Sequence, residues 1–259
     1  GVRKFKRNAR SGSHRLQFRG RKSVAKLVEE CEKDPDIEYV EPNYIINAHF
    51  RPNDQYYRYQ WHLDGPGSGG INMEDAWDIS TGHETIVAVL DTGVAYERYT
   101  KVINSLRSEE YYQAPDLAQT QFVPGYDFVE NDDHPNDDQG HGTHVTGTIA
   151  QSTNNAIGTA GVAFNTKIMP VKILNRNGSG SVFDFADGVT FAVDNGADII
   201  NLSLGGRVGS STMRRACEYA HDKGVTLVCS SGNDGDDRIS YPAAYDHCCI
   251  SVGASRVDE

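Results

Sequence analysis

The chain has 259 residues, with 25 Lys and Arg against 36 Asp and Glu and a formal net charge of −11. A chain of this length can bury the core of one large α/β domain and still carry a smaller unit. Membrane spanning is excluded, because no apolar run approaches the roughly 18 residues that a transmembrane helix requires. The acidic balance also argues against nucleic acid as a partner.

The first 48 residues differ from the rest in charge and in pattern. They hold 11 Lys and Arg against 7 Asp and Glu, whereas the other residues hold 14 against 29. Their pattern predicts a strand at 15–18, an amphipathic helix at 23–34 and an edge strand at 37–46 that contains Pro42. We therefore expect a small α+β unit at 1–48 and a larger domain at 49–259.

The larger part alternates apolar strands with amphipathic helices, after a connector at 49–70 that lacks periodicity. Strands are predicted at 85–91, 167–174, 198–204, 225–231 and 248–254, and helices at 141–152, 181–195 and 210–223. This alternation predicts an α/β fold in which helices cover both faces of a parallel β-sheet. In such a fold the functional site lies at the carboxyl ends of the strands, where Asp91, Asn201 and Asn233 fall.

Two features of composition bear on cations and on redox chemistry. Residues 108–166 contain nine Asp and Glu and neither Lys nor Arg, so this stretch attracts cations. The five cysteines show no CxxC spacing that would indicate zinc or a redox motif. We interpret them as buried or free thiols, with one disulfide as the alternative.

An aspartate closes an apolar strand in VAVLDTGV at 87–94. The following Thr92 and Gly93 fit a tight turn that holds the Asp91 carboxylate at the strand end, although an aspartate in such a turn is also common without any function. DTG is equally the signature of aspartic proteases, which need two such carboxylates sharing a proton. One DTG is present and the α/β pattern does not fit an all-β protease, so a dimer of one-DTG subunits is the aspartic alternative.

A histidine begins a predicted helix in HGTHVTG at 141–147. His141 stands beside Gly140 and Gly142, which expose it toward a cleft, as a general base requires. Metal binding by the two histidines is the weaker interpretation, because neither an HExxH pattern nor a nearby thiolate accompanies them. His144 lies within the same helix and is interpreted as a packed, hydrogen-bonded histidine.

Four motifs follow one another along the chain: VAVLDTGV, HGTHVTG, NLSLGG at 201–206 and SSGNDG at 230–235. In this order they resemble the subtilisin-like serine proteases over residues 54–259, because Asp, His and then Ser is the chain order of the subtilisin triad. Segments 52–63 and 125–135 resemble the thermitase-like branch of that family. The resemblance implies that Asp91 orients His141, that His141 takes the proton of a serine, and that the side-chain amide of Asn233 binds the oxyanion.

No serine in a matching context follows before residue 259. We therefore expect the catalytic serine to lie beyond that residue, and the chain as given to be inactive. A non-catalytic peptide-binding relative of the same fold is the alternative. A nucleotide-binding α/β protein is disfavoured, because GxGxxG and the P-loop pattern are both missing.

The resemblance also assigns a peptide-binding cleft, in which an extended polypeptide adds as a strand between two segments whose glycines permit close approach. These segments contain Gly178, Ser179 and Gly180 on one side and Ser203, Leu204 and Gly205 on the other. Ser240 stands where many relatives have Gly. We expect it to narrow the pocket for the principal substrate side chain, near 241–245.

Two loops resemble the calcium sites of the family, and calcium prefers the carboxylate, amide and carbonyl oxygens that they offer. For the first site the resemblance implies the side chains of Asp54, Asp116 and Asn155 and the carbonyl oxygens of Ile157 and Thr159. For the second site it implies Asp127, Asp132 and Asn136, with a solvated acidic loop as the alternative. Bound calcium is expected to stabilise the folded chain by mass action.

Residues 1–48 resemble the later part of a subtilisin-type propeptide, and EYVEPNY at 38–44 is the strongest match. We expect this unit to act as an intramolecular inhibitor and folding aid, with its processing point within 46–53. The resemblance thus implies a secreted and monomeric protease precursor, or zymogen, that cleaves polypeptides and has no membrane or nucleic-acid partner.

Overall fold

The structure is a computed structural model that describes residues 2–8, 10–44, 50–65, 69–235 and 237–256. It divides into two compact units, Gly1–Ala48 and His49–Glu259. The division coincides with the change from basic to acidic charge along the sequence. Within the described ranges, every helix is too short or too polar to cross a membrane.

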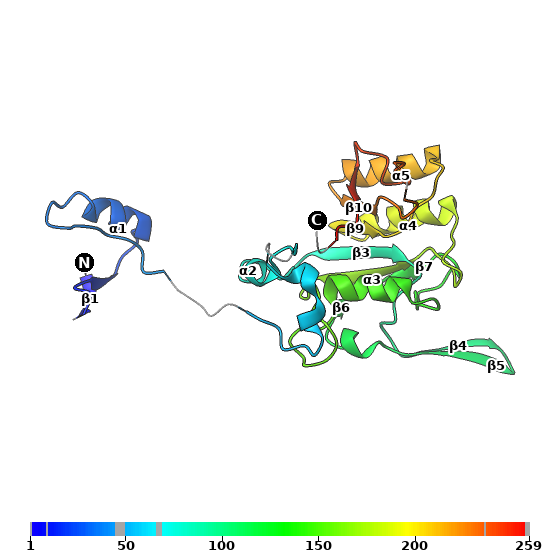
Figure 1. Ribbon diagram of the computed structural model, residues 1–259, viewed down its shortest axis with the longest axis horizontal. Coiled ribbons are helices and arrows are strands. Elements are labelled where there is room, and N and C mark those ends of the chain that lie inside the picture. The colour runs from blue at the N-terminus through cyan, green and yellow to red at the C-terminus, as the bar shows by residue number, and fades with distance from the viewer. Residues whose placement is uncertain (1, 9, 45–49, 66–68, 236, 257–259) are drawn as a thin grey trace. The chain divides into compact units, whose positions relative to one another are not determined.

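The N-terminal unit is an antiparallel hairpin followed by a helix (Figure 1). Its elements are β1 (Val2–Arg7), β2 (His14–Phe18) and α1 (Val24–Cys31). The helix begins where the Ser23 hydroxyl accepts a hydrogen bond from the amide of Lys26, a standard N-cap.

One strand prediction for this unit is wrong. Residues 37–44 form no strand, because no neighbouring segment of the described chain pairs with them, and residues 45 and 46 lie outside the described residues. The strand that does pair with β2 is β1, which sequence patterning missed because its side chains are mainly basic rather than apolar.

The larger unit is built on a seven-stranded parallel sheet, which confirms the predicted α/β fold. The strand order is β11-β10-β9-β3-β8-β6, and β7 also pairs with β8. The strands are β3 (Ile86–Asp91), β6 (Gln121–Phe122), β7 (Tyr126–Asp127), β8 (Lys167–Lys172), β9 (Ile199–Leu202), β10 (Thr226–Ser230) and β11 (Cys249–Val252). Each predicted apolar run contains one of them.

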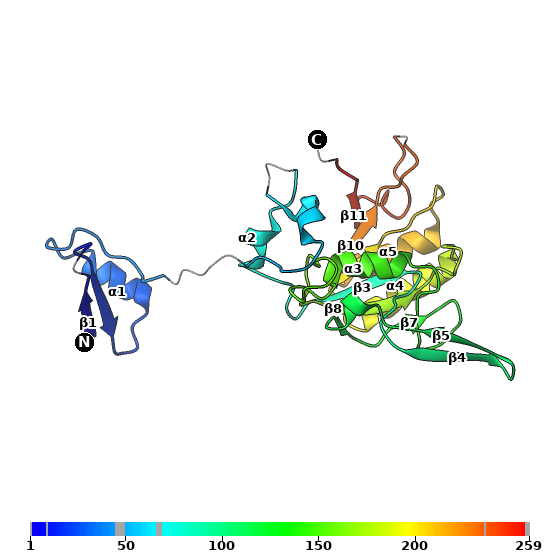
Figure 2. The ribbon, with the colours of Figure 1, turned by 60° about the horizontal axis from the view of Figure 1, so that its bottom comes forward.

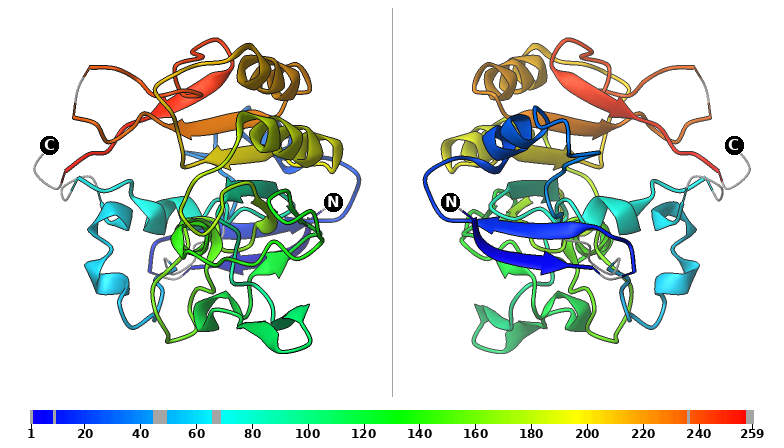
Figure 3. Two further views of the ribbon diagram at one scale, coloured as in Figure 1. Left: turned by 90° about the vertical axis from the view of Figure 1, so that its right-hand side faces the viewer. Right: turned by 90° about the vertical axis from the view of Figure 1, so that its left-hand side faces the viewer.

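Helices cover both faces of this sheet (Figure 3). They are α3 (His141–Ala150) on one face and α4 (Val182–Asp194) and α5 (Ser211–Asp222) on the other. Successive side chains of β3 point to opposite faces of the sheet. Val87 and Val89 belong to the core beneath α3, whereas Ala88 and Leu90 belong to the core beneath α4 and α5. A strand that is apolar on both faces is therefore what this position requires.

The segment before β3 contributes more than the connector that the sequence predicted at 49–70. Residues 50–65 contain two 3₁₀ turns, Tyr57–Tyr59 and Trp61–Leu63, and the short helix α2 (Met73–Trp77) follows. Tyr57, Leu63 and Trp77 form a small buried core of their own. This segment therefore packs against the larger unit through buried side chains, whereas the sequence predicted a connector on its surface.

A second unpredicted element interrupts the chain between β3 and α3. The strands β4 (Tyr99–Asn104) and β5 (Arg107–Tyr111) form an antiparallel hairpin outside the main sheet. It projects from the larger unit in both views (Figures 1 and 2). A further 3₁₀ turn, Pro115–Leu117, leads back to the sheet.

All five cysteines are free thiols. Four of them, Cys217, Cys229, Cys248 and Cys249, are buried where α5 packs against β10 and β11. The sulfur atoms of Cys248 and Cys249 lie 3.9 Å apart. The interpretation as buried or free thiols agrees with this arrangement.

Candidate active site

The two most specific motifs of the sequence meet at the carboxyl edge of the sheet. Asp91 ends β3 and is completely buried, and His141 is the first residue of α3. The Nδ1 atom of His141 lies 2.8 Å from Oδ1 and 3.0 Å from Oδ2 of Asp91. Because Nδ1 is bound to the carboxylate, the other ring nitrogen, Nε2, is left to exchange a proton at the exposed edge of the ring.

Burial is the largest influence on the Asp91 carboxyl and raises its pKa above the ordinary range. Hydrogen bonds from His141 and from the Thr92 amide, at 2.7 Å for the amide, oppose that shift. The ionised form of Asp91 thus depends on its partners. The hydrogen bond from His141 is the largest of these opposing influences on the pKa of Asp91.

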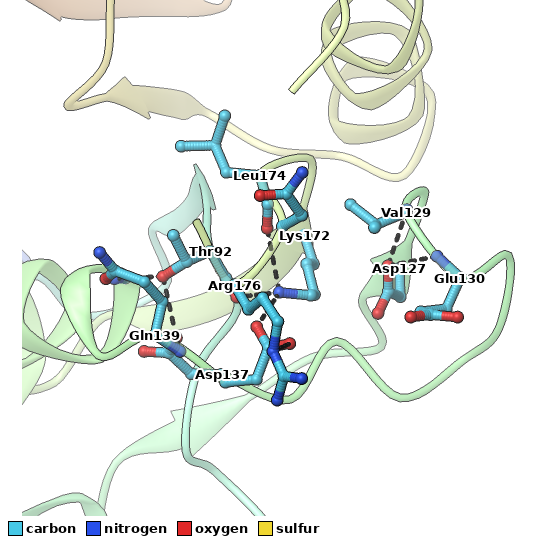
Figure 4. A network of polar contacts seen from close by, with 12 residues as sticks. Thr92, Asp127, Val129, Glu130, Asp137, Gln139, Lys172, Leu174 and Arg176 are labelled. Carbon is cyan, nitrogen blue, oxygen red and sulfur yellow. Dashed lines mark hydrogen bonds and ion pairs between the residues drawn. The ribbon is translucent and has the colours of Figure 1, made fainter. Parts of the chain in front are cut away.

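A second carboxylate, that of Asp137, joins the turn after Asp91 to the start of the helix that carries His141, and Figure 4 shows it beside Thr92 and Gln139. Its Oδ1 accepts hydrogen bonds from the Thr92 hydroxyl and from the amides of Gln139 and Gly140, at 2.8 to 3.0 Å. Its Oδ2 accepts from both the amide and the hydroxyl of Thr143. Asp137 therefore satisfies free amides at the start of the helix that carries His141.

The Thr92 hydroxyl completes this connection, because it also accepts a hydrogen bond of 2.9 Å from the amide of Gly142. Gly142 has no room for a side chain, since a Cβ there would collide with the carbonyl of Gly93. The strand end that holds Asp91 and the helix start that holds His141 are thus bonded to each other directly and through Asp137. We call Thr92, Asp137 and Thr143 the strand-helix clamp.

A buried lysine supports the same edge from β8. The ammonium of Lys172 donates to the carbonyls of Thr92 and Leu174, at 2.5 and 2.9 Å, and forms an ion pair of 2.7 Å with Asp138 (Figure 4). Its side chain is 3% exposed. A buried charge with three acceptors is costly to disturb, so this lysine fixes the turn after β3.

Sequence reasoning missed the clamp and Lys172. The only available signal was the polar string NDDQG directly before HGTHVTG, which contains Asp137 and Asp138. The interpretation of His144 as a packed histidine is wrong, because α3 presents it to solvent.

The first predicted peptide-binding segment lies after β8 and is exposed. Gly178 has a φ of +71° in a turn closed by its amide on the carbonyl of Asn175, and Ser179 follows it. A Cβ on Gly180 would collide with the carbonyl of Ile173. The glycines are needed to keep this backbone close to the sheet and open to solvent.

The second predicted segment, with Ser203, Leu204 and Gly205, follows β9. Its neighbour Gly206 forms a two-way backbone bridge of 2.9 Å with Tyr241. Asn233 lies beyond β10 at the same edge of the sheet and is exposed. Arg207 follows the segment after β9, and Asp234 follows Asn233 after β10. Their side chains form an ion pair of 3.1 Å.

The side chain of Ser240 lies between Gly205, which follows β9, and Gly232, which follows β10. A Cβ added to Gly205 would lie 2.9 Å from Cβ of Ser240, and one added to Gly232 would lie 2.6 Å from its hydroxyl. The side chain of Ser240 thus fills the space between the glycines that flank it. The narrowing of a substrate pocket by this side chain stays a prediction.

The residues of the first predicted calcium site lie together. The amide of Asn154 donates to Asp54 at 2.7 Å, and the side-chain amide of Asn155 donates to Asp116 at 2.8 Å. Asp116 Oδ2 also accepts from the amide of Thr159 at 3.1 Å.

The charge balance of this loop suits a divalent cation. Burial raises the pKa of Asp116, and the nearby charge of Asp54 raises it further. A Cβ on Gly158 would overlap the Asp116 carboxylate, so the loop backbone approaches that carboxylate closely. The backbone of Ile157 belongs to the same loop, since its amide donates to Asn155 at 2.8 Å.

The second predicted site also draws its residues together. Asp127 and Asp132 exchange backbone hydrogen bonds of 2.9 and 3.2 Å, and burial raises the pKa of Asp127 to about 6. Asn136 is 3% exposed, and its Oδ1 is buried without a hydrogen-bond partner in the described part of the chain. A buried oxygen without a partner, on a residue that lines the same groove as Asp127 and Asp132, is chemically suited to be a ligand of a cation.

Nowhere among the described residues do three carboxylate, imidazole or thiolate side chains converge as one metal-binding group. Both loops offer two carboxylates each. A calcium ion would therefore depend on amide and carbonyl oxygens for the rest of its coordination, which calcium accepts and zinc does not favour.

Comparison with known proteins agrees with this geometry. The model of the subtilase family, peptidase S8, matches residues 82–258. The chain therefore belongs to the subtilase family.

Two curated relatives resemble it over most of its length. It is 42% identical over 236 residues to the "Thermophilic serine proteinase" of Bacillus sp. (strain AK1), covering 90% of this chain and 53% of that protein. It is 39% identical over 209 residues to "Thermitase" of Thermoactinomyces vulgaris, covering 81% of this chain and 67% of that protein.

A solved structure, described as proteases from Pseudoalteromonas arctica PAMC 21717, has a TM-score of 0.63 at 33% identity, over 78% of this chain and 64% of that one. The chain thus spans between about half and two thirds of the length of these relatives. Two further relatives, at 33% and 38% identity, carry the word "extracellular" in their names.

Proposed function

We propose that this chain belongs to the precursor of a serine endopeptidase that hydrolyses peptide bonds in proteins through an acyl-enzyme. The observation that carries the proposal is the hydrogen-bonded pair of Asp91 and His141 at the carboxyl edge of a subtilase sheet. Names that include serine proteinase and thermitase among its relatives support the same activity.

In this mechanism Asp91 holds the ring of His141 and stabilises its protonated form. The Nε2 atom of His141 takes the proton of the attacking serine and later delivers it to the leaving amine. The side-chain amide of Asn233 donates to the oxyanion of the tetrahedral intermediate. The strand-helix clamp keeps the distance between Asp91 and His141 fixed while the charge moves.

We place the nucleophilic serine beyond residue 259, so the 259-residue chain alone is expected to be inactive. Full-length protein should react covalently with a serine-directed fluorophosphonate and hydrolyse a chromogenic peptide. The His141→Ala variant should lose both properties while it retains its fold.

A non-catalytic peptide-binding protein of the same fold is the second candidate. The two segments proposed to bind peptide favour it, because 178–180 and Gly205 are exposed and need no serine to hold a peptide. If the full-length protein binds peptide but resists the fluorophosphonate, this second candidate holds and the enzyme proposal fails.

The substrate is proposed to be an extended polypeptide. Its backbone would pair with Gly178 to Gly180 on one side and Ser203 to Gly205 on the other, which makes binding largely independent of sequence. Specificity would then come from side-chain pockets, of which the one beside Ser240 would be narrow. A peptide with a small residue before the cleaved bond should be hydrolysed faster than one with an aromatic residue.

Calcium is proposed as the bound cation. The first site would use Asp54, Asp116, Asn155 and the carbonyls of Ile157 and Thr159, and the second Asp127, Asp132 and Asn136. The ion would compensate the carboxylates that burial places side by side. Calcium at about 100 times the dissociation constant of a site should stabilise the 259-residue chain by about 2.7 kcal/mol for each occupied site, relative to a chelator.

That stabilisation is measured by thermal or urea unfolding with and without calcium. The Asp116→Asn variant should lose the part of it that the first site supplies, whereas Asp222→Asn, at the end of α5, should keep all of it. Equal stability of the wild-type chain in calcium and in chelator would refute this part of the proposal.

The unit at 1–48 is proposed to be part of a propeptide that inhibits the protease until it is cut within 46–53, and the protein is proposed to be a secreted monomer. The excess of basic residues in 1–48 complements the excess of acidic residues in the larger unit. Relatives named as extracellular support secretion. Separately expressed residues 1–48 should inhibit the mature enzyme in a competitive manner.

A further inference from the structure

The β4–β5 hairpin and the second predicted calcium loop line one groove. Tyr99 and Lys101 on β4 and Glu109 and Tyr111 on β5 alternate in sequence, and all of them line a groove of about 660 Å³. Asp127, Asp132 and Asn136 line the same groove. The hairpin, which is an insertion between β3 and α3, thus faces the loop.

The root of the hairpin is anchored to that loop. The ring of Tyr99 stacks on the ring of His134, with centroids 3.7 Å apart and planes inclined by 14°. His134 Nδ1 lies 2.9 Å from Glu97 Oε1, which also accepts a hydrogen bond of 2.9 Å from Asn136 Nδ2. This anchoring fixes where the next side chain on the same face of β4 points.

That next side chain is Lys101, and its ammonium reaches two carboxylates of the loop. It lies 3.6 Å from Glu130 Oε2 and 4.0 Å from Asp132 Oδ2. Both distances exceed that of a hydrogen bond, so the attraction is mainly Coulombic. The lysine side chain is 26% exposed and has a path to solvent.

Lys172 is the other ammonium near this loop, and it differs in kind. It is 3% exposed and held by Asp138 and by two backbone carbonyls. Lys172 therefore cannot leave without breaking the turn after β3, whereas Lys101 can move away at little cost.

We propose that Lys101 is an internal counter-ion of the second calcium site and competes with calcium for the carboxylate of Asp132. The inference rests on the proposed calcium site and not on proteolytic activity. The buried Oδ1 of Asn136, which has no partner among the described residues, marks where a ligand oxygen is already in place. Calcium draws its ligand oxygens to within roughly 2.3–2.6 Å, a distance that leaves no room for an ammonium on the same oxygen.

Calcium and the ammonium of Lys101 would therefore replace each other at the same loop. At low calcium, Lys101 neutralises the loop and ties the hairpin to it. At high calcium, the divalent ion takes Asp132 and Lys101 turns to solvent or to Glu130. The hairpin thereby lowers the affinity of the second site and lessens the dependence of the loop on calcium.

The test is calorimetric titration of the 259-residue chain with calcium chloride, together with thermal unfolding in chelator. Lys101→Met removes the charge and keeps the aliphatic stem, Lys101→Arg keeps the charge, and Lys223→Met removes one positive charge from the end of α5. Asp132→Asn identifies which binding event belongs to the second site.

Lys101→Met should tighten the Asp132-dependent event by about 3- to 10-fold and lower the unfolding temperature in chelator. Lys101→Arg and Lys223→Met should leave the affinity unchanged. Equal affinities for wild type and Lys101→Met would overturn the competition while leaving the calcium site intact. Absence of any Asp132-dependent event in both chains would overturn the site as well as the competition, and neither result bears on the protease proposal.

Discussion

The two sides of the candidate active site are built differently. On the side of β3 and α3, Asp91 is buried, and hydrogen bonds join it to His141 and to the Thr92 amide, while the Thr92 hydroxyl accepts one from Gly142. On the side of β9 and β10, Asn233 and Gly205 are exposed, and the ion pair of Arg207 and Asp234 joins the segments that carry them. The proton-transfer geometry is therefore set before substrate arrives, whereas the substrate side keeps backbone and amide groups open.

The largest expected effect lies on the open side. Asn233→Ala in the full-length protein should lower kcat by about 10²- to 10³-fold with little change in KM, because one oxyanion donor acts only in the transition state. Its fold should be unaffected, since the side chain is exposed. Steady-state kinetics with a chromogenic peptide decide the matter. A loss that resides in KM alone would assign Asn233 to substrate binding instead.

On the closed side, the hydroxyl of Thr92 is the smallest group whose removal should loosen the clamp. Thr92→Val deletes the hydrogen bonds to Asp137 and from Gly142 and should cost about 1–3 kcal/mol of stability, with a fall of about 10-fold in kcat. Thr92→Ser keeps the hydroxyl and should restore both quantities. If serine behaves like valine, the methyl group rather than the hydroxyl is what the site needs.

The stabilisation of the fold by the charge of Asp137 should depend on pH in the acidic range. Burial raises the pKa of this carboxyl, but hydrogen bonds from Thr143, Gly140 and Gln139 outweigh burial and hold the pKa below its ordinary value. Because the folded pKa is lowered, the ionised group stabilises the fold above about pH 4, and this contribution is lost as the pH falls below that value.

Asp137→Asn should therefore destabilise the 259-residue chain by about 1–3 kcal/mol at pH 7 and by less at pH 3. Urea unfolding of both chains at the two pH values measures the difference. Asp187→Asn on α4 is the matched control and should show no such dependence. A difference that is equal at pH 3 and pH 7 would remove the ionised carboxylate from the clamp.

The smallest effect is expected from Ser240 on the open side. Ser240→Gly removes the side chain between Gly205 and Gly232 and should raise kcat/KM for peptides with a large apolar residue before the cleaved bond by about 10-fold. Peptides with alanine there should change little. Competition between the two peptides in one reaction measures the ratio directly, and an unchanged ratio would show that Ser240 does not bound the pocket.

The same contrast explains what could be predicted from the sequence. Asp91 and His141 could be paired in advance, because each motif occupies the end of a regular element at one edge of a parallel sheet. The clamp could not, since Thr92 and Asp137 are 45 positions apart, with the β4–β5 hairpin and the strands β6 and β7 between them. Lys172 is hidden in an apolar run, where nothing in the sequence shows that its ammonium finds three acceptors.

Unpredicted strands share one physical cause. The strands β1, β4 and β5 are largely polar in sequence and form antiparallel hairpins outside the main sheet. Hydrophobic periodicity detects burial and not pairing. The apolar strands of the central sheet were predictable for the opposite reason.

The four thiols buried between α5 and the strands β10 and β11 affect whether unfolding of this protein is reversible. They are protected while the domain is folded, but unfolding releases Cys217, Cys229, Cys248 and Cys249 together into solvent. In an oxidising medium, exposed thiols form non-native bridges before the chain can refold. The lifetime of the domain under such conditions is then governed by its rate of unfolding, and a reducing agent should restore reversibility without altering the folded state.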